Sequence, residues 1–180
     1  MGFLSKIFGK KDAAFEDASR IYTKLMSQAR RVEFYGENSA PDNYDGRIDV
    51  LTLHMAAILR ALADQGEQGE RLSQALYDVM RDDFEVAMRE EGLSDTGIKK
   101  RIKPMMQLFF TRVKTYAKAM SADEAEAHVN DALLAGLLAG NETGYPKALS
   151  AYAVQFLTHL KGLSLGQIAL AEFDFPAAPK

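Results

Sequence analysis

The chain has 180 residues, a hydrophobic fraction of 47% and a formal net charge of -3, which together predict one globular domain with short appendages. It contains no cysteine, which excludes disulfides, thiolate metal sites and cysteine nucleophiles. The small negative charge argues against bulk nucleic-acid binding, so we expect no DNA partner. No apolar run reaches the roughly 18 to 20 residues that a membrane-spanning helix needs.

The chain begins with a short amphipathic segment, residues 1–11. On a helix its four large apolar side chains occupy one arc, and its lysines add positive charge. A helix shorter than ~12 residues is marginal in water, so we expect this segment to fold on a surface. The pattern favours membrane contact through Phe3, Leu4, Lys6, Ile7, Phe8 and Lys10. The alternatives are that the segment packs against its own domain or stays disordered.

Helical periodicity continues through residues 12–175 and predicts a single compact all-α domain, followed by a tail at 176–180. No segment alternates with the period of a β-strand. The helices that we expect cover residues 14–33, 48–63, 70–91, a stretch that starts at Ser94 or Asp95, 121–138, 146–161 and 165–172.

The second of these helices, residues 48–63, is apolar almost all round and should be the centre of the core. The loop before it, residues 36–46, concentrates Gly, Pro, Asn and Asp. Asp45 is the expected N-cap of the core helix, and Gly46 should permit a tight entry. Arg47 or Arg30 is expected to pin the loop by pairing with Asp42 or Asp49.

Three local patterns mark other helix ends. Gly92 should end the helix over 70–91 as its C-cap. Pro104 should kink or split the next helix, because proline removes a backbone donor and clashes with the preceding turn. Ser121 and Glu124 match a capping box at the start of the helix over 121–138.

The stretch 97–120 is basic and contains no acid. Residues 64–95 carry ten acids against three bases, so adjacent helices of opposite sign would pair with each other. The alternative is a basic surface for anionic lipid or ribosomal RNA. The bases are Lys99, Lys100, Arg101, Lys103, Arg112, Lys114 and Lys118.

The same stretch holds five large apolar residues in close succession, more than one helix face can hide. Core packing accounts for most of them, and one or two are candidates to line an adaptable groove for apolar helices. These residues are Met105, Met106, Leu108, Phe109 and Phe110.

Candidate catalytic and metal-binding residues are few. The three histidines, His54, His128 and His159, have no Glu three positions earlier, which argues against a ferritin-like metal site. His54 lies on an apolar face, where a core histidine bonded to a carbonyl is a simpler interpretation than a ligand or base. Asp82 and Asp83 could form an acid/base pair, but an exposed acidic face explains them better. We expect no metal and no cofactor.

Two blocks of residues form a longer and more specific pattern. The first runs through 28–31, 33–35, 41–42, 44–49 and 51–54. The second comprises Asp82, Asp83, Phe84, Met88, Arg89, Glu90, Gly92, Asp95, Lys100, Lys103, Met106, Phe109, Phe110, Arg112 and Tyr116. Together they resemble the ubiquinol-cytochrome c chaperone family, with Thr111 standing where that family usually has glycine.

The resemblance implies a non-enzymatic assembly factor for the cytochrome bc1 complex, whose mitochondrial relatives bind newly made cytochrome b near the ribosome exit and the membrane. No mitochondrial presequence is visible, which favours a bacterial member. We therefore expect a chaperone that holds nascent cytochrome b at the cytoplasmic face of the membrane, peripherally attached, with the ribosome as a further candidate partner.

The candidate client-binding residues are Tyr35, Pro41, Tyr44, Arg47, Lys99, Lys100, Lys103, Met106, Phe109 and Phe110. The expected structural residues are Asp45, Gly46, Asp49 and His54. One alternative is a helical enzyme for an apolar, isoprenoid-like substrate, with Asp82, Asp83 and His54 enclosed in its site. Another is a nucleic-acid-binding module that uses the basic stretch.

Overall fold

The computed structural model describes the backbone of residues 3–179 and the side chains of residues 13–179. Every regular element in that part of the chain is a helix, and the predicted all-α class is confirmed. The elements are α1 (Phe3–Ala29), a 3-10 helix η1 (Val32–Phe34), α2 (Tyr44–Ala63), α3 (Gly66–Glu90), α4 (Asp95–Ala119), α5 (Ala125–Leu134), α6 (Tyr145–Lys161) and α7 (Leu165–Ala169).

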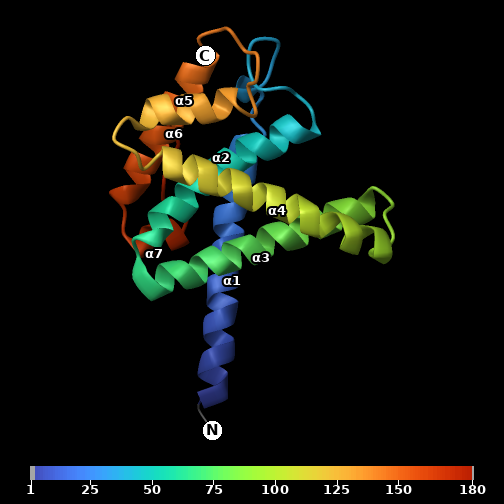
Figure 1. Cartoon of the computed structure of the whole chain (residues 1–180). Coiled ribbons are helices and arrows are strands. Elements are labelled where there is room, and N and C mark those ends of the chain that lie inside the picture. The colour runs from blue at the N-terminus through green and yellow to red at the C-terminus, as the bar shows by residue number, and fades with distance from the viewer. Residues whose placement is uncertain (1–2, 180) are drawn as a thin grey trace.

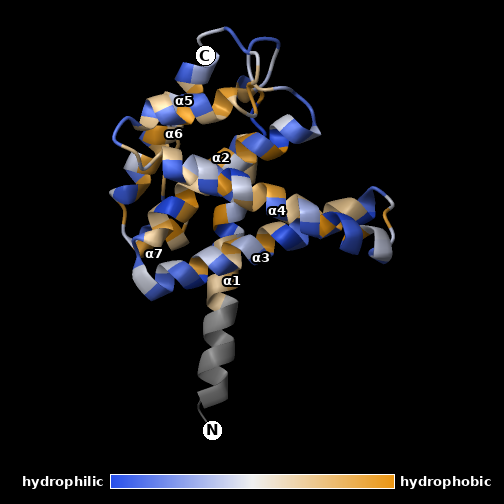
Figure 2. Cartoon of the chain, viewed as in Figure 1, coloured by the Kyte–Doolittle hydropathy of each residue, from blue (hydrophilic) through white to orange (hydrophobic). Residues whose placement is uncertain are grey.

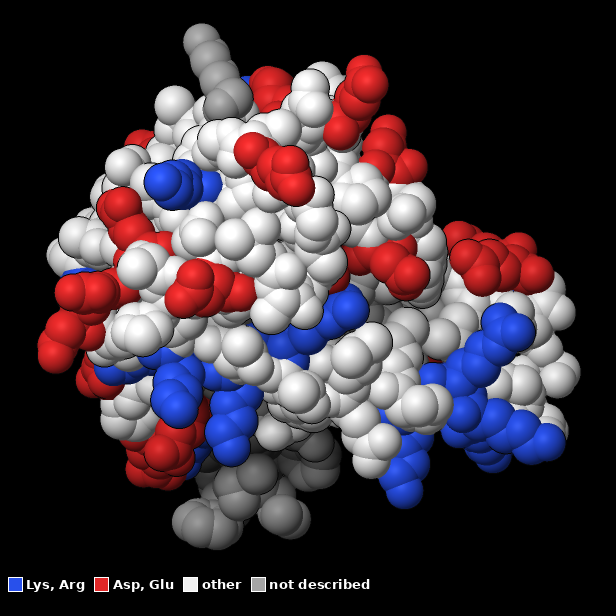
Figure 3. Space-filling view, turned by 45° about the horizontal axis from the view of Figure 1, so that its top comes forward, with Lys and Arg blue, Asp and Glu red and all other residues white. Residues whose placement is uncertain are grey.

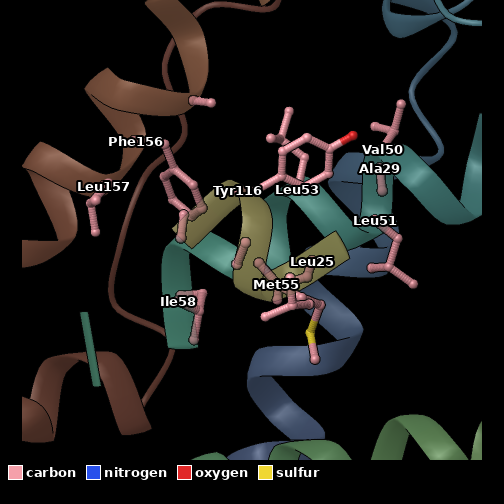
Figure 4. Close-up of a cluster of buried hydrophobic side chains, with 14 of the residues drawn as sticks. Leu25, Ala29, Val50, Leu51, Leu53, Met55, Ile58, Tyr116, Phe156 and Leu157 are labelled. Atoms are coloured by element: carbon pink, nitrogen blue, oxygen red, sulfur yellow. The ribbon is translucent and has the colours of Figure 1, made fainter. Parts of the chain in front are cut away.

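The predicted core helix, residues 48–63, is the centre of the fold and lies within α2. Residues 49–58 are all buried, because α1, α3, α4 and α6 each pack against α2. Figure 4 shows side chains of α2 such as Leu53 and Ile58 among Leu25 of α1, Tyr116 of α4 and Phe156 of α6. A helix with apolar residues on every side can be stable in water only when neighbours cover all of its faces.

The helices around α2 are amphipathic. In α3 the buried positions recur every four residues from Leu72 to Met88, and the remaining positions are mostly polar. Figure 2 shows hydrophobic and hydrophilic residues interspersed in the same way along the other outer helices. α3 and α4 form a hairpin whose tip projects from the body of the molecule (Figure 1).

The segment after α7, residues 170–179, begins with a turn at 170–171 and then runs along the core without regular secondary structure. Lys24 of α1 donates hydrogen bonds to the carbonyl oxygens of Ala171 and Phe173. Phe173 is buried, and the Phe175 ring lies against Phe156 with 4.9 Å between ring centroids. α7 lies near one end of the molecule and the C-terminus at the other (Figure 1), so this segment spans the bundle.

The helix ends agree with the sequence at some positions and differ at others. Ser94 caps α4 by accepting a hydrogen bond from the Gly97 amide, as expected. Gly92 adopts φ +87° directly after α3, the left-handed conformation that glycine provides at a C-cap. Pro104 lies inside α4 without splitting it, because α4 is held against its neighbours on both sides of the proline through Ile98 and Met106.

Two predicted caps were wrong. The N-cap of α2 is Asn43, whose side chain accepts from the Gly46 amide, so Asp45 lies two residues further in, within the first turn, where its charge faces the positive end of the helix dipole. The capping box at Ser121 and Glu124 does not form. Ser121 instead donates to Ala117 at the end of α4 and accepts from Arg60.

Gly46 is required by a close approach of two backbones. A Cβ at this position would lie 2.0 Å from the carbonyl oxygen of Pro41, and a backbone atom cannot move aside cheaply. Gly97, also in the first turn of a helix, has only ordinary contacts, the nearest at 3.5 Å to the Ser94 hydroxyl.

We predict that Gly46→Ala lowers the free energy of unfolding by about 2 to 4 kcal/mol, because the loop over 36–43 must shift away from α2. Urea unfolding followed by circular dichroism measures this change. Gly97→Ala is the matched control, and we expect it to be neutral or to stabilise by up to about 1 kcal/mol. Equal effects of the two substitutions would contradict the steric explanation.

Candidate functional site

An open pocket of about 230 Å³ lies where α1, α2 and α3 meet. Its floor is apolar and formed by Met26, Ala29, Ile48, Leu51, Phe84 and Ala87. Its rim is polar and carries Arg30, Tyr44, Arg47 and Asp83. This combination of an apolar floor and a few charged rim groups suits an apolar side chain whose neighbours are polar or acidic.

The loop between α1 and α2 positions one side of this pocket. Arg47 donates to the Asp42 carboxylate at 2.8 Å, which confirms one of the expected loop pairings. The Arg47 guanidinium also lies over the Tyr35 ring, 5.3 Å from its centroid, and the Tyr35 hydroxyl donates to the Ala29 carbonyl. Burial raises the pKa of Tyr35 to about 12, so the phenol stays protonated and keeps this hydrogen bond.

The predicted aromatic loop residues differ in what they offer to a partner. Tyr35 is half-buried and supports Arg47, whereas Pro41 and Tyr44 are exposed. The Tyr44 hydroxyl lies 3.8 Å from the Met105 sulfur, which links the rim of the pocket to α4. The sequence had indicated the rim residues through their pattern, but it gave no indication that α3 completes the pocket.

On the α3 side of the pocket, Asp83 accepts a hydrogen bond of 2.8 Å from the Tyr22 hydroxyl. Asp83 and Asp82 are both exposed, and Asp82 pairs with Arg81 of the same helix. The alternative of an enclosed catalytic site with Asp82, Asp83 and His54 is wrong, because the two carboxylates face solvent while His54 is buried elsewhere in the core.

His54 is buried in the core, and both of its ring nitrogens have hydrogen-bond partners. Its Nδ1 lies 2.7 Å from the Val50 carbonyl and its Nε2 2.7 Å from the Tyr152 hydroxyl, which also accepts from Gln28. The carbonyl can only accept, so Nδ1 carries the proton and Nε2 accepts from Tyr152. Burial lowers the pKa of His54 to about 4. Both nitrogens are therefore occupied, and neither is free for a haem iron.

Asp49 is the other predicted structural residue, and its partner differs from the expected one. Its carboxylate is buried on α2 and pairs with Arg112 of α4, whereas the sequence suggested Arg30 or Arg47. Burial raises the pKa of Asp49 above its usual value, and Arg112 opposes that shift. The pair fixes the rotation of α4 against the core helix, because a buried carboxylate left without a partner is costly.

The Met- and Phe-rich stretch of α4 divides between the core and the surface. Met106 and Phe109 are 4% and 3% exposed and pack in the core, so a partner does not reach them in this conformation. Phe110 is 47% exposed and stacks on Tyr77 of α3 with 4.7 Å between centroids. Leu108 is 51% exposed on another side of the helix.

The charges of α3 and α4 do not neutralise each other across the hairpin. The acids Asp78, Asp82 and Glu85 lie near Arg81 within α3 itself. Among the described side chains, the ion pair between the two helices joins Arg89 to Asp95. In the described part of the chain no carboxylate lies within 4 Å of a lysine of α4, and Lys99, Lys100 and Lys103 are all exposed.

Within the described residues, no group of three or more His, Asp or Glu side chains is arranged to hold a metal ion. No helix in the part of the chain that the structure describes combines the length and apolar character needed to cross a bilayer. The predicted membrane-contact residues Phe3, Leu4, Lys6, Ile7, Phe8 and Lys10 lie outside the described side chains.

Comparison with known proteins agrees with the resemblance noted in the sequence. The family model described as ubiquinol-cytochrome C chaperone matches residues 37–175. The chain belongs to this family. The matched residues include the pocket residues of α2 and α3, the basic helix α4, and His54 with its partner Tyr152.

Two similar proteins extend the comparison. The Xenopus laevis ubiquinol-cytochrome-c reductase complex assembly factor 1 is 23% identical over 124 residues, which are 69% of this chain and 62% of that protein. The crystal structure of the Cbp3 homolog from Brucella abortus superposes with a TM-score of 0.80 at 26% identity and covers 98% of both chains. The helical arrangement is therefore that of this bacterial protein.

The burial of His54 predicts a specific dependence of stability on pH. The folded state keeps His54 neutral down to about pH 4, whereas the unfolded chain binds a proton near pH 6.5. Stability from this source is present above the unfolded pKa and is lost as the pH falls from there toward 4. Between about pH 7 and pH 5 we expect a loss of about 2 kcal/mol in the free energy of unfolding.

The variant His54→Gln has no proton to bind and isolates this contribution. Urea unfolding of both proteins across this pH range should show that His54→Gln is less stable at pH 7 but loses about 2 kcal/mol less on acidification. Parallel pH profiles for the two proteins would contradict a neutral buried His54.

Proposed function

We propose that this protein is a non-enzymatic assembly chaperone of the cytochrome bc1 complex and that its client is newly made cytochrome b. Family membership supports the assembly role. The observation that carries the client-binding part is the open apolar pocket between α1, α2 and α3 with its charged rim. The chain spans 62% of the Xenopus assembly factor, and the role of that protein in the ubiquinol-cytochrome-c reductase complex is the reason for choosing this complex.

The pocket suits one part of a transmembrane helix. Its apolar floor would take one or two large side chains of the client, which gains about 25 cal/mol per Å² of apolar surface removed from water. Arg30 and Arg47 on the rim would pair with acidic or carbonyl groups that flank the apolar stretch. Tyr44 and Pro41 are exposed beside this rim and would extend the contact, while Tyr35 holds Arg47 in place.

We further propose that the protein works at the cytoplasmic face of the membrane as a peripheral protein, close to the ribosome that makes the client. The amphipathic segment 1–11 would supply membrane contact, since it combines a stripe of large apolar residues with lysines. The exposed bases Lys99, Lys100 and Lys103 with Phe110 form a second partner-facing surface on α4. A chaperone that holds, shields and releases its client would not need to make or break covalent bonds.

Blocking the pocket should prevent client capture. Ala87 lines the pocket on α3, so Ala87→Phe should fill it and reduce recovery of cytochrome b with a tagged chain at least about tenfold. Val86, the preceding residue of the same helix, is 49% exposed and outside the pocket, and Val86→Phe is the matched control with recovery unchanged. Mass spectrometry of the captured proteins measures both; recovery of soluble proteins alone with the unchanged chain would refute the proposed client.

The N-terminal contact can be tested separately. We predict that Phe3→Ser/Phe8→Ser lowers co-sedimentation with vesicles that contain anionic lipid at least about tenfold, because each phenylalanine contributes about 1.5 to 3 kcal/mol when buried. Phe15→Ser, at an exposed position of α1 outside the segment, is the control. Unchanged co-sedimentation of the double variant would remove the N-terminal segment from the proposal.

A further inference from the structure

We infer that the outer face of α4 is itself a docking surface for an anionic lipid bilayer. This inference rests on the proposed function only for its setting at a membrane, because the contact requires no client. It concerns the stripe formed by Lys99, Lys103, Phe110 and Lys114, which we call the α4 stripe. At 100° per residue these four positions fall within an arc of about 60° and extend along about 22 Å of helix.

The lysines of the α4 stripe have no carboxylate within 4 Å in the described part of the chain. The neighbouring acids of α3 lie beside arginines of α3, and the carboxylate that pairs with Arg112 lies on the opposite, inner side of α4. No acid occurs between residues 97 and 120, and Lys100 and Lys118 flank the stripe on its outer side. Each lysine near an anionic bilayer contributes about fivefold to partitioning.

Placement in the molecule makes this face accessible. The tip of the α3–α4 hairpin projects from the body (Figure 1), and basic side chains gather on the projecting lobe at the right of Figure 3. The three lysines of the stripe are exposed, and none donates a hydrogen bond among the described side chains. A projecting helix can meet a flat surface without obstruction by the rest of the domain.

The composition of the stripe favours lipid over RNA. Phe110 lies between the lysines with 47% of its surface exposed, and an apolar ring flanked by lysines suits the boundary between headgroups and acyl chains. One face of that ring is already stacked on Tyr77, which hinders stacking by a nucleotide base. The stripe contains lysines but no arginine. It therefore lacks the planar guanidinium groups that make bidentate hydrogen bonds to nucleic-acid phosphates and bases.

The test measures sedimentation of the full chain with phosphatidylcholine vesicles that contain or lack phosphatidylglycerol. Lys103→Gln/Lys114→Gln removes two stripe lysines, and Lys147→Gln/Lys161→Gln removes two exposed lysines of α6 as the matched control. We expect partitioning onto phosphatidylglycerol vesicles to fall about 30-fold for the stripe pair and to change by less than about twofold for the control pair. The net charge of the two variants is the same.

Phe110→Ala tests the apolar part of the contact. Partitioning should fall about fivefold, and this loss should persist at high salt, which screens the lysines but not the ring. Circular dichroism and thermal unfolding confirm that each variant is folded before its binding is compared.

Three results would overturn the inference: equal losses for the two lysine pairs, equal binding to vesicles with and without phosphatidylglycerol, or a stripe pair that loses affinity for a ribosomal RNA hairpin while vesicle binding is unchanged. The last result would assign the face to RNA. If cytochrome b is not captured but stripe-dependent vesicle binding is intact, only the proposed client is refuted. If cytochrome b is captured but the stripe pair binds vesicles normally, only the lipid contact is refuted.

Discussion

The need to cover α2 on every side determines the rest of this structure. Residues 49–58 are buried without interruption, so no face of the helix can be left to water. Four helices surround it, and each contributes one apolar side and keeps a polar side outward. The surfaces proposed to be functional therefore lie where this cover is incomplete or where a covering helix extends beyond the core: the pocket at the start of α2, and the outer face of the α3–α4 hairpin.

Two buried polar contacts fix how the covering helices are oriented. Asp49 pairs with Arg112 and sets α4 against the first half of α2. His54 bonds to Tyr152 and sets α6 against its middle. Apolar packing alone tolerates small rotations, whereas a buried carboxylate or imidazole without its partner costs several kcal/mol. With α4 fixed in this way, its lysines point outward, and Tyr77 and Phe110 meet at the surface.

The sequence predicted the fold class, the central helix and the buried role of His54, because these follow from periodicity and from an imidazole on an apolar face. It failed at two helix ends, where Asn43 caps α2 in place of Asp45 and Ser121 donates to the Ala117 carbonyl of α4. It also failed where a long-range contact decides the outcome. Arg112 as the partner of Asp49 is separated from it by 63 positions, and no local pattern shows such a pair.

The same limit applies to the site. The rim residues Tyr44 and Arg47 were identifiable because they belong to a family pattern. Phe84 belongs to the same pattern, but its place in the pocket, like that of Ala87, follows only from the packing of α3 on α1 and α2. Met106 and Phe109 could not be separated from Phe110 by composition, because a methionine and two phenylalanines in five positions give no sign of which faces inward. Only the register of α4 against α2 decides that two are core and one is surface.

The segment over residues 170–179 has a consequence for how the protein is made. It is synthesised after all seven helices of the described chain, yet it places Phe175 5.8 Å from the His54 ring and carries the carbonyls that bind Lys24 of α1. Until it leaves the ribosome, Phe175 cannot cover the side of the core around His54. Lys24 of α1 also lacks its carbonyl partners. This chain thus completes its own core only when these late residues have emerged.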